Sequence, residues 1–215
     1  NKSWDMVHYH DWTYEIKEGH SNKIIAYCNE TEDPAHCAYQ GRNEAVSCTV
    51  TAESRAYDGT EYAGAVVNNW ITEKTGDAAV TYYEGTGDTD YPENENAPVN
   101  AGTYKFVVKI ADVTAYAEFE IQRLDQNVEF DVIDYTFGDS VEAPAVTGAQ
   151  EDPVIEYYYT TENSNTDGTL WENSRSADPG TYYMYAKVCA TTNYNEYVTQ
   201  PVQFRHNSGR YCKDI

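Results

Sequence analysis

Short stretches in which apolar and polar residues alternate follow one another along the whole chain. In Thr103–Ile110 the residues Tyr104, Phe106, Val108 and Ile110 share one face, and in Ala117–Gln122 apolar residues alternate with Glu and Gln. An alternation of period two is typical of a β-strand with one buried face. Because turn residues separate these stretches and no helical period is present, the pattern predicts an all-β fold built as an antiparallel sandwich or rolled sheet.

The same alternation predicts the other strands and a hairpin near the start of the chain. His8–Ile16 is expected to be a strand, 18–22 a turn, and Lys23–Cys28 the returning strand. In Val46–Thr51, Cys48 falls on the inward side with Val46 and Val50, which predicts a buried free thiol. Further strands are expected at Tyr62–Val67, Ala79–Tyr83, Val154–Tyr159 and Thr181–Cys189.

Two landmarks recur at one interval. The glycines of Ala101-Gly102-Thr103-Tyr104 and Pro179-Gly180-Thr181-Tyr182 are separated by the 78 residues from 102 to 180, and Tyr57 and Tyr135 by the 78 residues from 57 to 135. Tyrosine pairs upstream of each Gly-Thr-Tyr fit the same frame to within about three residues, a difference that a hairpin loop tolerates. The interval predicts two copies of one domain.

The chain length of 215 residues accommodates two such copies and one additional module. The expected division is a Cys/His-containing β-hairpin module at 1–45, a first repeat at 46–124, and a second repeat at 125–215 with an insertion before Val202. The segment 122–126 has no Gly, Pro or Ser, so we expect limited swing between the repeats and an elongated monomer.

Five cysteines suggest two disulfides. A bridge between Cys28 and Cys37 would hold the small hairpin with about 2–3 kcal/mol, and a bridge between Cys189 and Cys212 would hold the C-terminal tail with roughly 3 kcal/mol. A zinc site is the less favoured alternative in the hairpin, since His8, His10, Cys28 and Cys37 match no common spacing of zinc ligands.

The repeated motifs resemble a known family. Tyr57-Asp58-Gly59, the Tyr-Tyr strand, Ala101-Gly102-Thr103-Tyr104 and Phe119-x-Ile121 are similar to the immunoglobulin-like repeats, called YDG or MBG type, of surface proteins from Gram-positive gut bacteria. The hairpin ahead of them resembles a segment that often precedes such repeats. The resemblance implies two tandem immunoglobulin-like β-sandwiches in an extracellular stalk or adhesin, with no catalytic residues to transfer.

Composition limits the partners. A net charge of −22 repels nucleic acid, and no stretch has the roughly 20 apolar residues of a membrane span, so neither nucleic-acid binding nor membrane insertion is expected. The low lysine content and the Tyr/Thr/Asn-rich strands favour an oxidising compartment, outside the cell, either secreted or attached to the cell wall.

Catalytic and metal-binding motifs are weak. No nucleophile elbow, zinc-protease helix or phosphate loop is present, so we expect no enzyme and no cofactor. Asn163–Gly168 resembles the front of a calcium loop, and Asp88 and Asp90 lie in another acidic loop, but solvated turns are the simpler interpretation of both. A Lys–Asn isopeptide bond is not expected at Lys105 or Lys109 and stays undecided at Lys187.

Aromatic residues offer the remaining candidate surface. Among Trp4, Trp12, Trp70 and Trp171, with the tyrosine strands, any exposed ring could stack on a sugar. We single out Trp12, Trp171 and Tyr9 as ligand-binding candidates. The leading hypothesis is a non-enzymatic stalk or adhesin segment of a bacterial surface protein. The alternatives are a module that binds a host glycan or extracellular protein, and an accessory domain of a secreted glycoside-active enzyme.

Overall fold

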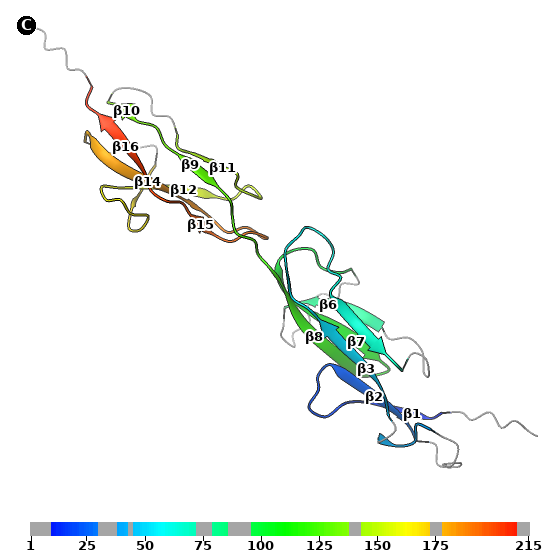
Figure 1. Cartoon of the computed structure of the whole chain (residues 1–215). Helices are drawn as coiled ribbons and strands as arrows, with labels where there is room; N and C mark the ends of the chain where they lie inside the picture. Colours follow the sequence, from blue (N-terminus) through cyan, green and yellow to red (C-terminus); the bar gives the residue numbers. More distant parts are fainter. Residues whose placement is uncertain are drawn as a thin grey trace, which may run out of the picture. The chain divides into compact units, whose positions relative to one another are not determined.

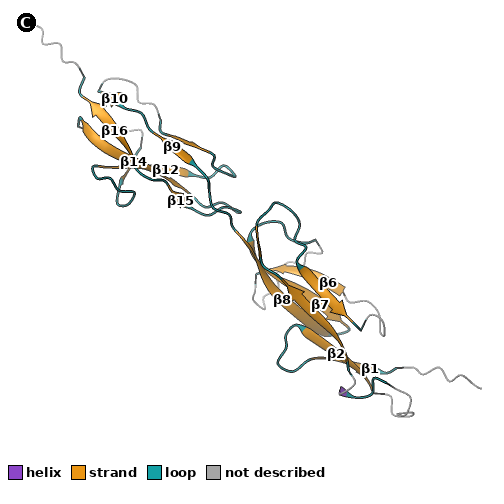
Figure 2. Ribbon diagram, in the orientation of Figure 1, coloured by secondary structure: helices purple, strands orange, loops and turns teal. Residues whose placement is uncertain are grey.

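The computed structural model describes residues 10–29, 38–42, 45–71, 79–85, 96–137, 143–172 and 178–209. The chain divides into two compact units, Asn1–Gln122 and Arg123–Ile215. The regular structure of the described residues consists of β-strands and a minimal 3₁₀ turn at Arg42, without any α-helix (Figures 1 and 2). The predicted fold class is confirmed: the protein is all-β, with two immunoglobulin-like units in tandem.

Unit 1 is a sandwich of two four-stranded sheets. The first sheet has the order β1-β2-β3-β5, and the second has the order β4-β8-β7-β6. All neighbouring strands are antiparallel except β4, which runs parallel to the end of β8. The strands are β1 (Trp12–Ile16), β2 (Lys23–Cys28), β3 (Val46–Ala52), β4 (Arg55–Ala56), β5 (Ala65–Asn69), β6 (Ala79–Glu84), β7 (Gly102–Ile110) and β8 (Val113–Gln122).

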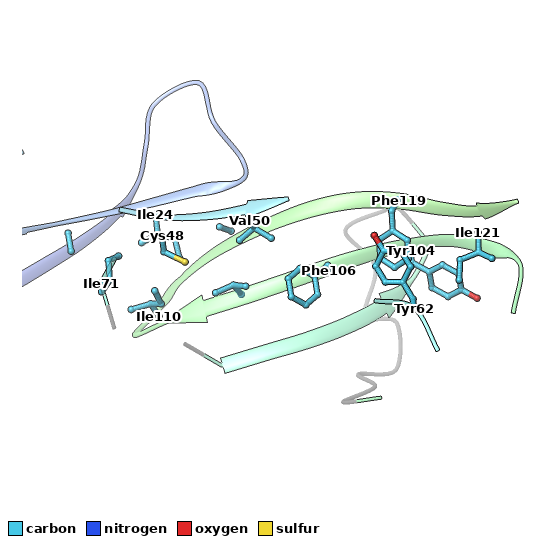
Figure 3. Close-up of a cluster of buried hydrophobic side chains, with 13 residues drawn as sticks. Ile24, Cys48, Val50, Tyr62, Ile71, Tyr104, Phe106, Ile110, Phe119 and Ile121 are labelled. Carbon is cyan, nitrogen blue, oxygen red and sulfur yellow. The ribbon is translucent and has the colours of Figure 1, made fainter. Parts of the chain in front are cut away.

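The core of unit 1 lies between these two sheets and has an aliphatic end and an aromatic end (Figure 3). Ile24 and Cys48 from the first sheet meet Ile110 from the second at the aliphatic end. At the aromatic end, Phe119 stacks on Tyr62 with ring centroids 3.8 Å apart and on Tyr104 at 5.4 Å. Both phenol groups reach polar partners: Tyr62 hydrogen-bonds the backbone of Glu53, and Tyr104 donates to the carbonyl of Asn100.

The N-terminal hairpin belongs to this sandwich, which corrects the expected separate module at 1–45. Strand β2 pairs with β3 from Lys23↔Thr49 to Ala26↔Val46, so the hairpin continues the sheet of the first repeat. Ile24 and Ala26 are both fully buried in the core. The physical reason is area: an isolated hairpin cannot cover its own apolar face, whereas the open edge of β3 supplies both backbone partners and a core.

Unit 2 has one large sheet and one small one. The large sheet has the order β10-β16-β14-β12-β13, with β15 also paired to β14, and the small sheet pairs β9 with β11. Strand β10 runs parallel to the end of β16, and the other pairs are antiparallel. The strands are β9 (Glu129–Asp131), β10 (Tyr135–Thr136), β11 (Ala145–Thr147), β12 (Ile155–Thr160), β13 (Thr169–Leu170), β14 (Gly180–Val188), β15 (Tyr197–Val198) and β16 (Val202–Asn207).

The strand pairing supports the predicted internal repeat. In unit 1 the central strands run β4-β8-β7-β6, and in unit 2 the same places are taken by β10-β16-β14-β12. Gly102 lies opposite Ile121, and Gly180 lies opposite His206. The insertion expected before Val202 is present and contains β15.

One predicted equivalence is shifted by two residues. The backbone N–H of Tyr57 donates to Gln122, and the matching bond in unit 2 comes from Phe137, which donates to Asn207. Tyr57 therefore corresponds to Phe137, and Tyr135 occupies the place of Arg55. A shift of two residues keeps every side chain on the same face of a strand, so the period of the sequence does not reveal it.

The Gly-Thr-Tyr motif is a packing device in both units. Each glycine begins a strand, and the ring of the tyrosine two residues later folds back over it. A Cβ on Gly102 would lie 3.1 Å from the Tyr104 hydroxyl, and one on Gly180 would lie 3.3 Å from the Tyr182 ring. The hydroxyls donate to the carbonyls of Asn100 and Asp178, four residues upstream. Glycine is used here for the space it leaves, because neither residue has a positive φ.

The segment after β8 is tied to unit 2. Leu124 donates its N–H to the carbonyl of Asn193 and accepts a bond from the N–H of Asn195. The Gln126 side chain accepts a bond from the N–H of Gln150, and the guanidinium of Arg123 donates to the carbonyl of Thr192. The residues predicted as a linker are therefore part of the hydrogen-bonded structure of unit 2.

A substitution in β2 tests whether the hairpin is integral to unit 1. Ile24→Ala should destabilise unit 1 by about 3 kcal/mol, because it leaves a cavity between the sheets. Ile25→Ala, one residue away on the opposite face of the strand, should have a much smaller effect. Hydrogen-exchange mass spectrometry would measure amide protection in β7 and β8. Unchanged protection of these strands in Ile24→Ala would show that the hairpin folds separately.

The tyrosine-rich cores predict alkaline instability. Burial raises the pKa of Tyr62, Tyr82, Tyr104 and Tyr157. Because the folded protein favours the neutral phenols, their contribution to stability is complete below the ordinary tyrosine pKa of about 10 and is lost as the pH rises above it. Tyrosinate absorbance should therefore rise first from the more exposed tyrosines and then, at higher pH, from the buried ones. The second rise should coincide with loss of the β-sheet circular dichroism. A single stage with the sheet signal intact would contradict this prediction.

Candidate functional site

Trp12 and Trp171, which the sequence suggests as ligand-binding residues, both take part in packing. Trp12 lies against the core of unit 1, with its ring centroid 4.9 Å from His10 and 5.6 Å from Tyr39. Trp171 packs edge-on against Tyr157 at 6.1 Å, next to the smaller core of unit 2. Tyr9 lies outside the described residues. A binding role for these three stays a prediction.

Trp70 is different because its side chain is 59% exposed. It directly follows β5, and its backbone N–H donates to the carbonyl of Ser47 at 3.1 Å, so it continues the pairing with β3. Ile71, the next residue, is fully buried. Because successive side chains of an extended chain point to opposite faces of the sheet, Trp70 points outward. Most of this indole is therefore left in contact with water.

A groove on the outer face of the first sheet lies beside Trp70. It has a volume of about 330 Å³ and is lined by Lys23, Ser47, Thr49, Asn68 and Trp70, together with Ala45 and Val46. The register explains the arrangement: Thr49 of β3 is paired with both Lys23 of β2 and Asn68 of β5. Three adjacent strands therefore place an ammonium, a hydroxyl and an amide in one row.

Three polar side chains of this groove keep their hydrogen-bonding groups available for a ligand. Within the part of the chain that the structure describes, Lys23, Thr49 and Asn68 have no side-chain hydrogen bond or ion pair. The lining contains donors and acceptors but no carboxylate, histidine or cysteine. The lining thus offers hydrogen-bonding groups and one cation beside the exposed indole, which are the groups with which a polar ligand can be bound.

The disulfide predictions can be followed only in part. Cys28 is buried at the end of β2, and Cys189 is half-buried and forms no disulfide with another cysteine that the structure describes. Cys37 and Cys212 lie outside the described residues, so the Cys28–Cys37 and Cys189–Cys212 bridges stay predictions. Cys48 is fully buried and without a disulfide, which confirms the predicted buried free thiol.

The metal candidates do not form a site among the residues that the structure describes, since no group of three His, Cys, Asp or Glu side chains is close enough to hold an ion there. His10 stacks against Trp12, whereas His8, Asp88 and Asp90 fall outside the described ranges.

The loop 163–168, with its resemblance to a calcium loop, is held by protein contacts. The Asn165 amide donates to the carbonyl of Thr199, and the N–H of Gly168 donates to the Tyr185 hydroxyl. A Cβ on Gly168 would lie 2.9 Å from the Tyr185 ring, so this glycine is needed for the loop to lie on the sheet. The loop thus covers the Tyr158–Tyr185 stack on that face of unit 2.

The lysines considered for an isopeptide bond are occupied otherwise. Lys187 lies 3.1 Å from Glu196, and both side chains are partly exposed. Lys105 lies on the side of β7 opposite the core, as predicted, yet it is only 8% exposed because its ammonium sits over the Tyr116 ring at 4.2 Å. Its cross-strand partner is Glu118, at 4.0 Å.

Comparison with known proteins adds no family. A scan against protein-family models finds no match, and a search of curated protein sequences finds none either. Among solved structures, the N-terminal four Ig domains of Dscam1 isoform 6.9 match at 11% identity with a TM-score of 0.37, over 87% of this chain and 54% of that one. A variant of titin domains I67–I69 matches at 10% identity with a TM-score of 0.30, over 93% and 87%.

A third match is the extracellular domains 3–5 of Drosophila OTK, at 10% identity with a TM-score of 0.27, over 87% of this chain and 70% of that one. The chain spans about half the length of the Dscam1 fragment. With such low TM-scores these likenesses carry no argument, so the description of the fold rests on the sheets and cores themselves. Among the described residues, no helix is long and apolar enough to cross a membrane.

The state of Cys48 predicts slow chemical modification. Burial raises the pKa of the Cys48 thiol, so little of the reactive thiolate forms near pH 8, which is roughly half a unit below the ordinary cysteine pKa. Iodoacetamide should therefore label Cys48 only after denaturation. Mass spectrometry of the peptide that contains Cys48 compares its labelling in the native and the denatured protein. Rapid native labelling of Cys48 would contradict its burial.

Proposed function

We propose that this chain is a non-enzymatic extracellular segment of a bacterial cell-surface protein, attached to the cell wall or secreted, in which tandem immunoglobulin-like units act as a stalk or adhesin spacer. The observation that carries this proposal is the parallel pairing of β4 with the end of β8 and of β10 with the end of β16. In both units a short early strand is thereby fastened to the last strand.

This geometry suits a spacer under tension. Once the strands ahead of it have detached, a force along the chain pulls the short strand β4 or β10 from its N-terminal end and the last strand of the unit from its C-terminal end. In a parallel pair these pulls are opposed along the strand direction, so they shear all the bridging hydrogen bonds together instead of opening them one at a time. Such pairing should slow unfolding under load, and forced unfolding depends on the rate of unfolding rather than on equilibrium stability.

The motifs that resemble YDG/MBG-type repeats support the same proposal, because their residues have structural partners. Asp58 accepts hydrogen bonds from the N–H and hydroxyl of Thr60 and from the Arg55 guanidinium. The bonds from Thr60 lower the pKa of Asp58, with Arg55 adding to them. Gly59 has a φ of 76°, which favours glycine in this turn. The motif therefore builds a turn next to the parallel pair.

Single-molecule force spectroscopy tests the proposal. Phe137→Pro removes the bond, 2.9 Å long, from the Phe137 N–H to the Asn207 carbonyl beside β10. Because this bond holds β10 to β16, we expect the substitution to accelerate the forced unfolding of unit 2 severalfold. Phe137 is exposed, so the loss of its side chain should contribute little to the effect.

The matched control is Leu170→Pro in β13, another exposed apolar residue, in an edge strand that pairs with β12 and not with the last strand β16. Its effect on forced unfolding should be smaller than that of Phe137→Pro. Equal forced-unfolding rates for Phe137→Pro and the unaltered chain would show that the parallel pair does not carry the load, and the spacer proposal would lose its support.

A further inference from the structure

We propose that the groove beside Trp70 is a binding site for a neutral carbohydrate, with Trp70 as the stacking platform and Lys23, Thr49 and Asn68 as hydrogen-bonding groups. The inference does not rest on the proposed spacer function, since it concerns the first sheet of unit 1, whereas the parallel pair of that unit belongs to the second sheet. It assigns a ligand class to a residue that neither the core nor the repeat requires.

The exposure of Trp70 is not a requirement of the fold. Because β3–β5 and β9–β11 occupy matching places in the two units, with Val67 paired to Val50 and Val146 to Phe130, the residue of unit 2 that corresponds to Trp70 is Ala149. The corresponding strand pair of unit 2 is thus formed with a methyl group at this position, two residues after the end of β11. A large exposed aromatic surface is unfavourable in water unless something covers it, and such surfaces often mark binding sites.

The rest of the groove also differs between the units. Thr49 and Asn68 are paired across the strands of unit 1, and the pair at the corresponding place in unit 2 is Glu129 and Thr147. Lys23 comes from the hairpin strand β2, which adds a third strand to this face in unit 1. The combination of indole, amide, hydroxyl and ammonium is therefore specific to unit 1.

The chemistry of the groove fits a sugar. A pyranose ring presents C–H groups that pack on an indole face, and its hydroxyl groups both donate and accept hydrogen bonds. The Asn68 amide and Thr49 hydroxyl can donate and accept, and the Lys23 ammonium can donate to three acceptors. Because these side chains have no partner among the described residues, binding a sugar would not break an existing interaction.

Size and charge narrow the ligand class. The volume of about 330 Å³ lies at the lower end of the roughly 300–1,000 Å³ typical of small-molecule sites, which suits a short glycan end. The net charge of −22 creates a field that repels anions such as nucleic acid or sulfated chains. Hydrolysis of the glycan would need two carboxyl groups, and the lining has none. The geometry therefore points to recognition of a neutral glycan without turnover.

The test is binding of the full chain to an array of glycans that end in glucose, galactose, N-acetylglucosamine, sialic acid or uronic acid. Affinities for the strongest glycans are then measured by calorimetry up to about 10 mM, because weak single-site binding is expected. We expect neutral glycans to bind, Trp70→Ala to weaken binding at least tenfold, and Asn68→Ala and Thr49→Ala to weaken it severalfold.

The matched control is Val66→Ala, which removes another exposed apolar side chain from the outer face of β5 but lies outside the groove. It should leave the affinity unchanged. Since Trp70 and Val66 are both exposed, neither substitution should shift the melting temperature, which separates loss of binding from loss of folding. Absence of binding to every neutral glycan by the folded chain, binding that survives Trp70→Ala, or a preference for acidic sugars would overturn the proposal.

Discussion

Both units depend on contacts among aromatic rings, in which a phenylalanine of the last strand stacks with two tyrosines, one from β7 or β14 and one from an earlier segment of the unit. Phe119 has Tyr62 and Tyr104 as neighbours, and Phe204 has Tyr135 and Tyr182 at 6.0 and 5.8 Å. Tyrosine suits a thin sandwich because the ring fills the core while the hydroxyl reaches a backbone carbonyl at its margin. The glycine beneath Tyr104 or Tyr182 leaves the space that lets the ring fold back.

The sheet that packs against these aromatic rings differs between the two units. In unit 1 the hairpin β1–β2 extends the sheet of β3 and β5, and thirteen of the described hydrophobic residues are buried in one cluster. In unit 2 the corresponding sheet consists of β9 and β11 among the described residues, and the cluster has three buried members. Trp171 and Phe130 pack against that smaller core. A tryptophan from a polar stretch of the sequence thus supplies apolar contacts that the hairpin supplies in unit 1.

The sequence predicts the strands and their faces well, because period two follows directly from the pleat. Val154–Tyr159 corresponds to β12, and Thr103–Ile110 lies within β7. The sequence does not predict which strands pair with one another, because the alternation in 23–28 does not indicate the strand edge to which this segment hydrogen-bonds. The sequence therefore predicts a separate hairpin, whereas β2 pairs with β3, and it matches Tyr57 to Tyr135, whereas the hydrogen bonds match Tyr57 to Phe137.

The candidate site illustrates the same limit of sequence patterns. The exposure of Trp70 could have been inferred from the alternation that continues through Val66 and Asn68, but the groove could not, because it requires Lys23 from β2 and Thr49 from β3 beside them. The groove exists only because the hairpin joins the first sheet, which it does to complete the core. The addition that buries Ile24 on one face thus also creates the polar face of unit 1 on the other, and a proposed ligand site follows from a requirement of folding.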